Sequence, residues 1–326
     1  RDRIIESSGV DTVQFDSSLT ASDIVLSRNV NSLVLTIDST ADSLTLTDYF
    51  VSSASRIENF VFADASQLPG EAAILDQFLS IRGTAADDAL TGSAGIDVIY
   101  GFEGNDTLNG LADNDTLYGG PDNDTLNGGA GTDSLQGEVG NDTYGYALGD
   151  GQDVVLDTAG FDAVSFGTGI GTTAVSTSRS GADLLLNVNV TGNPGRVTVQ
   201  NYFNGQETEE IRFADGTIWD VATVRARLLA ASSTSGNDLI LGYESNDTIN
   251  SLAGNDTVYA GAGNDVIDGG LGSDTLYGED GDDVINAGSG DSNKASVVNN
   301  LYGGNGNDVL IASGKPDQLF GGPGND

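Results

Sequence analysis

Aspartate recurs every nine residues along two long stretches of the chain, and this period constrains the fold more than any other feature. In the first stretch the period gives Asp88, Asp97, Asp106, Asp115, Asp124, Asp133 and Asp142. In the second it gives Asp238, Asp247, Asp256, Asp265, Asp274 and Asp283 and, after an insertion at residues 287–302, Asp308, Asp317 and Asp326. Glycine usually opens each unit, and an aliphatic residue follows two positions after the aspartate. A short fixed period of this kind indicates a solenoid of stacked units.

The nine positions of a unit divide into a turn and a strand. Glycine tolerates positive φ and Asp and Asn accept turn geometry, so the first six positions predict a tight loop. The last three predict a short strand whose central aliphatic side chain points to one side and whose neighbours point to the other. Such a strand cannot stand alone and must pair with copies of itself. The expected fold class is all-β, a parallel β-roll (a right-handed β-helix of nonapeptide repeats).

Two units would complete one turn of the roll, which places every second unit directly above the first at a strand spacing of ~4.8 Å. We name the two resulting columns by their first members. The Asp88 column holds Asp88, Asp106, Asp124 and Asp142, and the Asp97 column holds Asp97, Asp115 and Asp133. Stacked carboxylates repel one another, and Ca²⁺ at ~2.4 Å from each oxygen would bridge two of them, with loop carbonyls as further ligands. All of the periodic aspartates are therefore predicted metal ligands, for roughly ten calcium ions in total.

The composition agrees with a chain that binds many cations. Asp and Glu number 49 against 12 Lys and Arg, a formal net charge of −37, which argues against nucleic acid and anionic membrane surfaces as partners. Cysteine and histidine are both absent, which excludes disulfides, zinc sites and Cys or His catalysis. Magnesium fits less well than calcium because it demands shorter, octahedral bonds. No apolar run approaches the ~18 residues of a membrane span, so we expect no membrane insertion. Because the catalytic residue types Cys and His are absent, we also expect no enzyme active site.

A coarser repeat contains the nonapeptide period. Residues 2–15 match residues 153–166 at an offset of 151, so the chain holds two copies of one cassette. The predicted segments are β-rich linker modules at 1–82 and 151–232, and repeat blocks at 83–150 and 233–326. Alternating apolar residues predict strands in both modules, and each module is expected to close with a short helix, at 69–80 and at 221–231. A start at Arg1 and an end within a repeat predict a longer parent chain with neighbouring cassettes.

The units resemble the RTX (repeats-in-toxin) family of bacterial proteins. Residues 119–127 and 303–310 are near-consensus copies of its nonapeptide, and the two modules are similar to the haemolysin-type calcium-binding related domain. The resemblance implies a calcium β-roll, secretion by a type I system and folding outside the cell. The expected location is therefore extracellular, either secreted or at the bacterial cell surface.

Several units depart from the consensus. The first, at residues 83–88, lacks the central glycines and is expected only to cap the roll. Asp113 and Asp122 replace the glycine of position four. Asn299 stands at an aspartate position, and Lys315 and Pro316 precede Asp317, which weakens the prediction of calcium there.

Two functions stay open at this point. In the first, the segment is a rigid calcium-bound spacer of an adhesin or a similar surface protein. In the second, it is the calcium-dependent secretion and folding region of a toxin or secreted hydrolase whose active domain lies elsewhere. The modules could also bind a surface glycan or a receptor. In each case we expect the repeats to be unfolded without calcium, because their strands are short and their charge is high.

Overall fold

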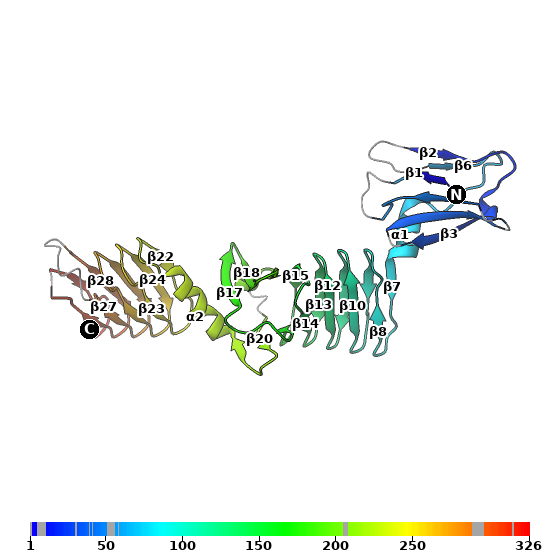
Figure 1. Cartoon of the computed structure of the whole chain (residues 1–326). Coiled ribbons are helices and arrows are strands. Elements are labelled where there is room, and N and C mark those ends of the chain that lie inside the picture. The colour runs from blue at the N-terminus through cyan, green and yellow to red at the C-terminus, as the bar shows by residue number, and fades with distance from the viewer. Residues whose placement is uncertain are drawn as a thin grey trace. The chain divides into compact units, whose positions relative to one another are not determined.

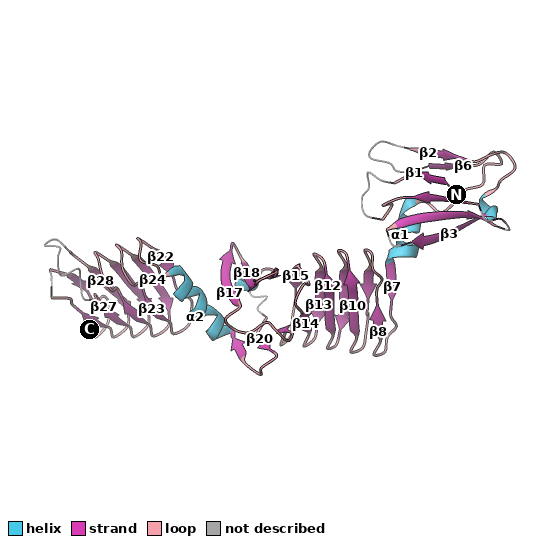
Figure 2. Cartoon of the chain, viewed as in Figure 1, coloured by secondary structure: helices cyan, strands magenta, loops and turns pink. Residues whose placement is uncertain are grey.

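The structure is a computed structural model, and it describes residues 2–4, 11–29, 31–38, 40, 42–50, 56–57, 59–204, 208–288, 297–314 and 316–326. Strands dominate the fold, and the helices are few and short (Figures 1 and 2). The chain forms two compact units, Arg1–Ser176 with Ser180–Ile218 and Thr177–Arg179 with Trp219–Asp326. Each unit contains stacked parallel strands, which confirms the predicted all-β parallel β-roll.

The first unit begins with a small β-rich module. Its strands are β1 (Asp2–Ile4), β2 (Thr12–Gln14), β3 (Ile24–Asn29), β4 (Ser32–Ile37), β5 (Ser43–Leu46) and β6 (Asn59–Val61). They form a sheet in the order β1-β5-β4-β3 and a separate β2-β6 pair. Helix α1 (Glu71–Leu79) lies within the predicted range 69–80 and so confirms that helix. The apolar core of the module includes Leu33, Tyr49, Phe50 and Ile74, all at most 2% exposed.

Two parallel sheets follow and form the first roll. One contains, in spatial order, β8 (Ala89–Thr91), β10 (Thr107–Ala112), β12 (Thr125–Ala130), β14 (Thr143–Tyr146), β16 (Ala163–Phe166) and β20 (Glu210–Phe213). The other contains β7 (Ser80–Arg82), β9 (Val98–Tyr100), β11 (Thr116–Pro121), β13 (Ser134–Val139), β15 (Gln152–Leu156) and β19 (Asn193–Val199). Leu108 pairs with Leu126, eighteen residues on, so two units make one turn as predicted. The aliphatic residues of the strands, such as Leu108, Leu117 and Leu126, are fully buried between the sheets.

The parallel pairing continues beyond the periodic sequence. Strand β13 pairs with β15, and β14 pairs with β16, at an offset of twenty residues instead of eighteen. The two additional residues lengthen the turn and leave the strand pairing intact. The roll therefore runs through residue 150, where the sequence period stops, and on to β19 and β20. Strand β18 (Asp183–Val190) pairs with β19 in the antiparallel sense. The chain crosses from one compact unit to the other within the strands β17 (Val175–Ser180) and β21 (Ile218–Asp220).

The second unit contains helix α2 (Val221–Ser232), which confirms the helix predicted at 221–231. Asp220 caps this helix by accepting a hydrogen bond from the Thr223 amide at 2.8 Å. One sheet of its roll contains β22 (Leu239–Leu241), β24 (Thr257–Ala262), β26 (Thr275–Asp280), β28 (Asn300–Asn305) and β30 (Gln318–Phe320). The other contains β23 (Thr248–Asn250), β25 (Val266–Asp268), β27 (Val284–Asn286) and β29 (Val309–Ile311).

The insertion in the second block does not interrupt the roll. Thr275 pairs with Asn300 across an offset of 25 residues, seven more than the regular turn. Strand β28 thus begins inside the range 287–302 that was predicted as inserted, and residues 289–296 of that range lie outside the described part of the chain. Among the helices that the structure describes, none has both the length and the apolar character needed to cross a membrane.

Candidate metal centres

Hydrogen bonds link the periodic aspartates from one turn of the roll to the next. The backbone N–H of Asp106 donates to Oδ1 of Asp124 at 2.7 Å, and that of Asp124 donates to Oδ1 of Asp142 at 2.7 Å. The Asp97 column repeats this arrangement from Asp97 to Asp115 at 2.7 Å. In the second unit it runs through Asp238, Asp256 and Asp274 and through Asp247, Asp265, Asp283, Asp308 and Asp326. The predicted stacking of aspartates is thus confirmed, and each carboxylate uses only Oδ1 in it.

The other carboxylate oxygen, Oδ2, is buried and has no hydrogen-bond partner at most positions of the columns. The residues that share this feature are Asp106, Asp115, Asp124, Asp133, Asp142, Asp153, Asp256, Asp265, Asp274, Asp283 and Asp308. A buried carboxylate oxygen without a partner is costly, and native structures pair such oxygens with donors or with a metal ion. These orphaned oxygens recur once per nonapeptide and so form two regular rows in each of the two rolls.

The glycine that opens each unit creates the space into which Oδ2 points. At Gly101 an added Cβ would collide with Oδ2 of Asp106 and with the carbonyl oxygen of Gly119, one turn further on. A carboxylate oxygen and a backbone carbonyl oxygen therefore face the same small space, which only a residue without Cβ leaves open. Calcium binds such hard oxygen donors at 2.3–2.6 Å. The donor set fits calcium, and the absence of His and Cys argues against a softer metal.

Burial and mutual repulsion disfavour the charged form of the column carboxylates. Burial raises the pKa of Asp115 and Asp124 to about 7, and repulsion from the neighbouring column carboxylates adds to this effect. The hydrogen bond that each receives from the preceding aspartate opposes the rise without cancelling it. In the second unit burial raises the pKa of Asp265 and Asp274 to about 6. A divalent cation beside these groups would reverse the shifts by favouring the charged form.

The first aspartate of a column has a different environment, because protein donors satisfy its Oδ2. Thr84 donates its amide and hydroxyl to Asp88 at 2.6 and 2.9 Å, which fits the expectation that residues 83–88 cap the roll. Amide or hydroxyl donors reach Oδ2 in the same way at the other first members, Asp97, Asp238 and Asp247. The Ser313 amide does the same at Asp317, which follows Asn299 in its column. The Asp97 carboxylate additionally forms an ion pair with Arg28 of the N-terminal module.

Asn299 occupies an aspartate position, as predicted. Its Oδ1 accepts the hydrogen bond from the Asp274 amide at 2.8 Å, so the stacking is preserved. Its Nδ2 donates to the carbonyl oxygen of Ala287 at 3.3 Å and to Oδ1 of Asp317 at 3.1 Å. The Asn299 amide group thus occupies the carbonyl oxygen of Ala287, whose counterpart in a regular turn, that of Gly119, faces the space beside a glycine.

Asp113 and Asp122, which replace the glycine of position four, adopt φ values of 67° and 83°. Aspartate tolerates this left-handed conformation better than most residues do, so the loop keeps its shape without glycine.

Sequence analysis missed two members of the columns. Asp133 donates its amide to Oδ1 of Asp153 at 3.1 Å, and Asp142 donates to Oδ1 of Asp162 at 2.8 Å. Residues 151–155 and 160–164 keep the glycine, the aspartate and the aliphatic residue of the unit. The longer turn before them displaces these motifs by two residues, and a search at a strict spacing of nine does not find them.

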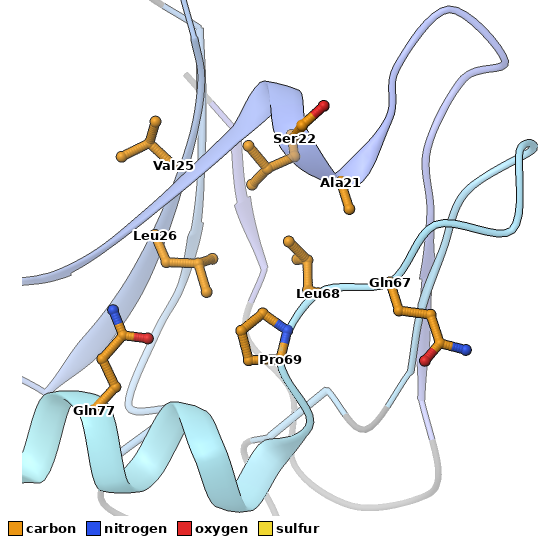
Figure 3. Close-up of a pocket in the computed structure, with 9 residues that line it drawn as sticks. Ala21, Ser22, Val25, Leu26, Gln67, Leu68, Pro69 and Gln77 are labelled. Atoms are coloured by element: carbon orange, nitrogen blue, oxygen red, sulfur yellow. The ribbon is translucent and has the colours of Figure 1, made fainter.

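The N-terminal module contains an open pocket between its 3₁₀-helix (Ala21–Asp23), β3 and the loop before α1 (Figure 3). Its lining is apolar or uncharged and includes Leu26, Leu68, Pro69 and Gln77. Among the described residues that line it, none has an ionisable side chain.

Known proteins match both parts of the chain. The RTX calcium-binding nonapeptide repeat matches residues 82–117, 109–144, 118–155, 232–267, 259–292 and 302–326. The haemolysin-type calcium binding protein related domain matches residues 33–70 and 183–223. The iron-regulated protein FrpA of Neisseria meningitidis serogroup C is 39% identical over 117 residues, which cover 33% of this chain and 10% of that protein. The match thus spans about a tenth of the relative's length. RTX repeats bind calcium, and the proteins that carry them are typically secreted. On the evidence of its repeats, its related modules and its β-roll, the chain belongs to the RTX family of calcium-binding nonapeptide repeat proteins.

Proposed function

We propose that the column aspartates of both rolls bind calcium through Oδ2 and that this binding folds the segment into a rigid spacer of a larger extracellular protein. The observation that carries the proposal is the recurrence of a buried Oδ2 without a partner beside a glycine in successive turns. Bound calcium supplies the positive charge that the columns lack. The carboxylates and the glycine carbonyls of adjacent turns hold it between them.

We assign the ligand role to the sixteen periodic aspartates, from Asp88 to Asp326, and add Asp153 and Asp162. Roughly ten ions would fit between vertical neighbours, and their charge would offset about twenty of the negative charges. The first members, Asp88, Asp97, Asp238 and Asp247, would contribute less than the others, because protein donors already occupy Oδ2 of each and Arg28 also pairs with Asp97. The spaces on either side of Asn299 are the weakest candidates, because its amide group competes with a metal there.

The proposal explains why a chain of such high charge would fold outside the cell. Extracellular modules bind calcium at about 10⁻⁴–10⁻³ M, far above the concentration in a cytosol. We therefore infer export of an unfolded chain by a type I system and refolding on contact with calcium. The four segments 1–82, 83–150, 151–232 and 233–326 would alternate along the spacer, with neighbouring cassettes of a longer parent chain as covalent partners.

The competing role is that of a folding region beside a toxin or hydrolase domain, and the length of the parent chain distinguishes the two. Many cassettes in series favour the spacer, and one or two beside a catalytic domain favour the competing role. A glycan or receptor partner of the modules would be tested on a glycan array.

The decisive experiment is far-UV circular dichroism of the purified chain, titrated from excess EGTA to about 10 mM calcium, with magnesium as the control. We expect a cooperative gain of β-structure near millimolar calcium and none with magnesium. A chain that is already folded in EGTA and indifferent to calcium would refute the proposed function.

A further inference from the structure

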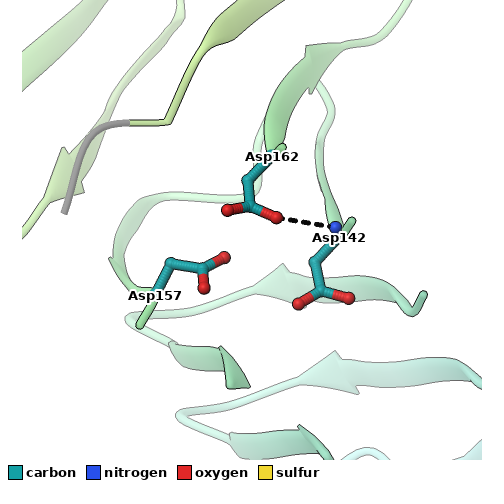
Figure 4. A group of neighbouring side chains, drawn as sticks. All are labelled: Asp142, Asp157 and Asp162. Atoms are coloured by element: carbon teal, nitrogen blue, oxygen red, sulfur yellow. Dashed lines mark hydrogen bonds between the residues drawn. The ribbon is translucent and has the colours of Figure 1, made fainter. Parts of the chain in front are cut away.

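Three buried carboxylates meet near the C-terminal end of the Asp88 column, where the Asp162 amide in turn donates to Oε2 of Glu209 at 2.7 Å. Asp142, Asp157 and Asp162 each place a carboxylate oxygen within 4.8 Å of those of the other two. Each of the three residues is at most 2% exposed. Figure 4 shows the carboxyl groups around one common space, with the Asp142 amide bonded to Asp162.

Asp157 lies outside the aspartate positions of the repeat. Strand pairing aligns Gln136 with Leu156, so the following residue, Asp157, lies over Gly137. In the regular turns a glycine occupies this position and adds only a backbone carbonyl to the space. Here a side-chain carboxylate replaces the hydrogen of that glycine, so the last turn of the column has an acidic group that the other turns lack.

Tyr144 holds Asp157 in place. It occupies the aliphatic position of its unit, paired with Leu126, and its hydroxyl donates to Oδ2 of Asp157 at 2.5 Å. The same hydroxyl accepts a hydrogen bond from the Gly137 amide at 3.0 Å. An added Cβ at Gly137 would collide with both the Tyr144 hydroxyl and Oδ2 of Asp142. The unpartnered, buried Oδ2 of Asp142 is therefore aimed into the space that Tyr144 and Asp157 border.

Among the described residues, no Lys or Arg forms an ion pair with Asp142, Asp157 or Asp162. Three carboxylates at this distance in a buried space require a cation or bound protons. The donors are all oxygens and exceed in number the one or two carboxylates typical of magnesium sites, so the matching ion is calcium.

We propose that Asp142, Asp157 and Asp162 form a calcium site that closes the Asp88 column, with Asp157 as a ligand from outside the repeats and Tyr144 as its positioning residue. The site rests on the proposed function, because Asp142 and Asp162 belong to the calcium-binding columns. It differs from the sites of the repeats in its third carboxylate.

The test is native mass spectrometry of the intact chain at saturating calcium, which counts retained ions as integers. The variant Asp157→Asn keeps an oxygen acceptor for Tyr144 and removes the charge. The control Glu103→Gln removes one charge from an exposed loop position. We expect Asp157→Asn to retain one ion fewer than the wild type, and Glu103→Gln to retain the full number. An unchanged number in Asp157→Asn would overturn the site, whereas a wild type without any calcium would overturn the proposed function itself.

A second measurement covers the case in which Asp157→Asn does not fold. Crystals of the wild-type chain grown with calcium would be examined for anomalous scattering. A peak between the three carboxylates supports the site. Peaks in the regular turns, with none between Asp142, Asp157 and Asp162, would refute it in favour of shared protons.

Discussion

The guanidinium of Arg28 donates a hydrogen bond of 2.7 Å to Oδ1 of Asp97, the first aspartate of its column. The two side chains are only 11% and 3% exposed. Arg28 also donates to the carbonyl oxygens of Phe78 and Ile96 at 2.8 and 2.7 Å, so three acceptors orient it. The N-terminal module thus supplies a fixed positive charge to the first carboxylate of the Asp97 column. We expect the later carboxylates of the column to depend on calcium for their charge compensation.

We predict that Arg28→Gln destabilises the first turns of the roll even at saturating calcium. Removing one partner of a buried ion pair leaves the other charge uncompensated and costs about 3–5 kcal/mol. Hydrogen exchange of the β9 amides measures this local stability. The matched control is Arg212→Gln, whose ion pair with Glu210 is more exposed and should contribute at most ~1 kcal/mol. Equal exchange in the two variants would contradict a special role for Arg28.

The calcium-free chain should gain β-structure as the pH falls. Burial raises the folded-state pKa of Asp115 and Asp124 from 3.8 to about 7 and that of Asp153 to about 8. Between the ordinary pKa of 3.8 and these raised values, the folded form binds more protons than the unfolded form. The stability of the folded form is therefore greatest at low pH and is lost as the pH rises through about 7 to 8.

This prediction is tested by circular dichroism in calcium-free buffer between about pH 5 and pH 8. We expect more β-structure at the acidic end. In the presence of calcium, protons compete with the metal, so the calcium concentration at half-folding should rise as the pH falls. A calcium-free chain that is more structured at pH 8 would show that the column carboxylates are not the destabilising groups.

Gly101→Ala should weaken the site at Asp106. Its Cβ would occupy the space shared by Oδ2 of Asp106 and the carbonyl oxygen of Gly119. Overpacking of this kind costs about 1–3 kcal/mol, and we expect the calcium concentration at half-folding to rise severalfold. In the control, Gly70→Ala, the new Cβ has no neighbour within 4 Å, and the calcium titration should be unchanged. An unaltered titration of Gly101→Ala would refute the glycine-lined space as the binding position.

Asn299→Asp should add a calcium site to its turn. The substitution replaces the Nδ2 donor, which bonds Ala287 and Asp317, by a second carboxylate oxygen. We expect one additional retained ion by native mass spectrometry, and lower stability when calcium is removed, because the new carboxylate is then buried and unpaired. Asn305→Asp adds the same charge at a more exposed position, where Nδ2 bonds Asp280, and should leave the ion number unchanged. No gain of an ion in Asn299→Asp would contradict the prediction.

Local rules explain why so much of the roll could be predicted. Within a unit, the turn depends on glycine and aspartate, and the direction of Leu108 or Leu126 depends on the alternation of a strand. Identical units then stack at a constant offset, so one period determines both sheets and both columns. The helices α1 and α2 were also predicted from local signals, a turn before the first and the capping Asp220 before the second.

By itself, the sequence determined the period of nine, the two columns, the buried aliphatic rows and the preference for an oxygen-binding cation, because each depends on residues adjacent in the chain or repeated at one interval. Only the tertiary structure decided that Oδ1 of the column aspartates accepts the hydrogen bond of the preceding turn while Oδ2 of most of them has no partner, and that the roll continues to Asp153 and Asp162 after a longer turn. Tertiary structure alone also brought Arg28 to Asp97, 69 residues away, and Tyr144 to Asp157. These contacts depend on how the turns stack in space, and no spacing in the chain encodes them.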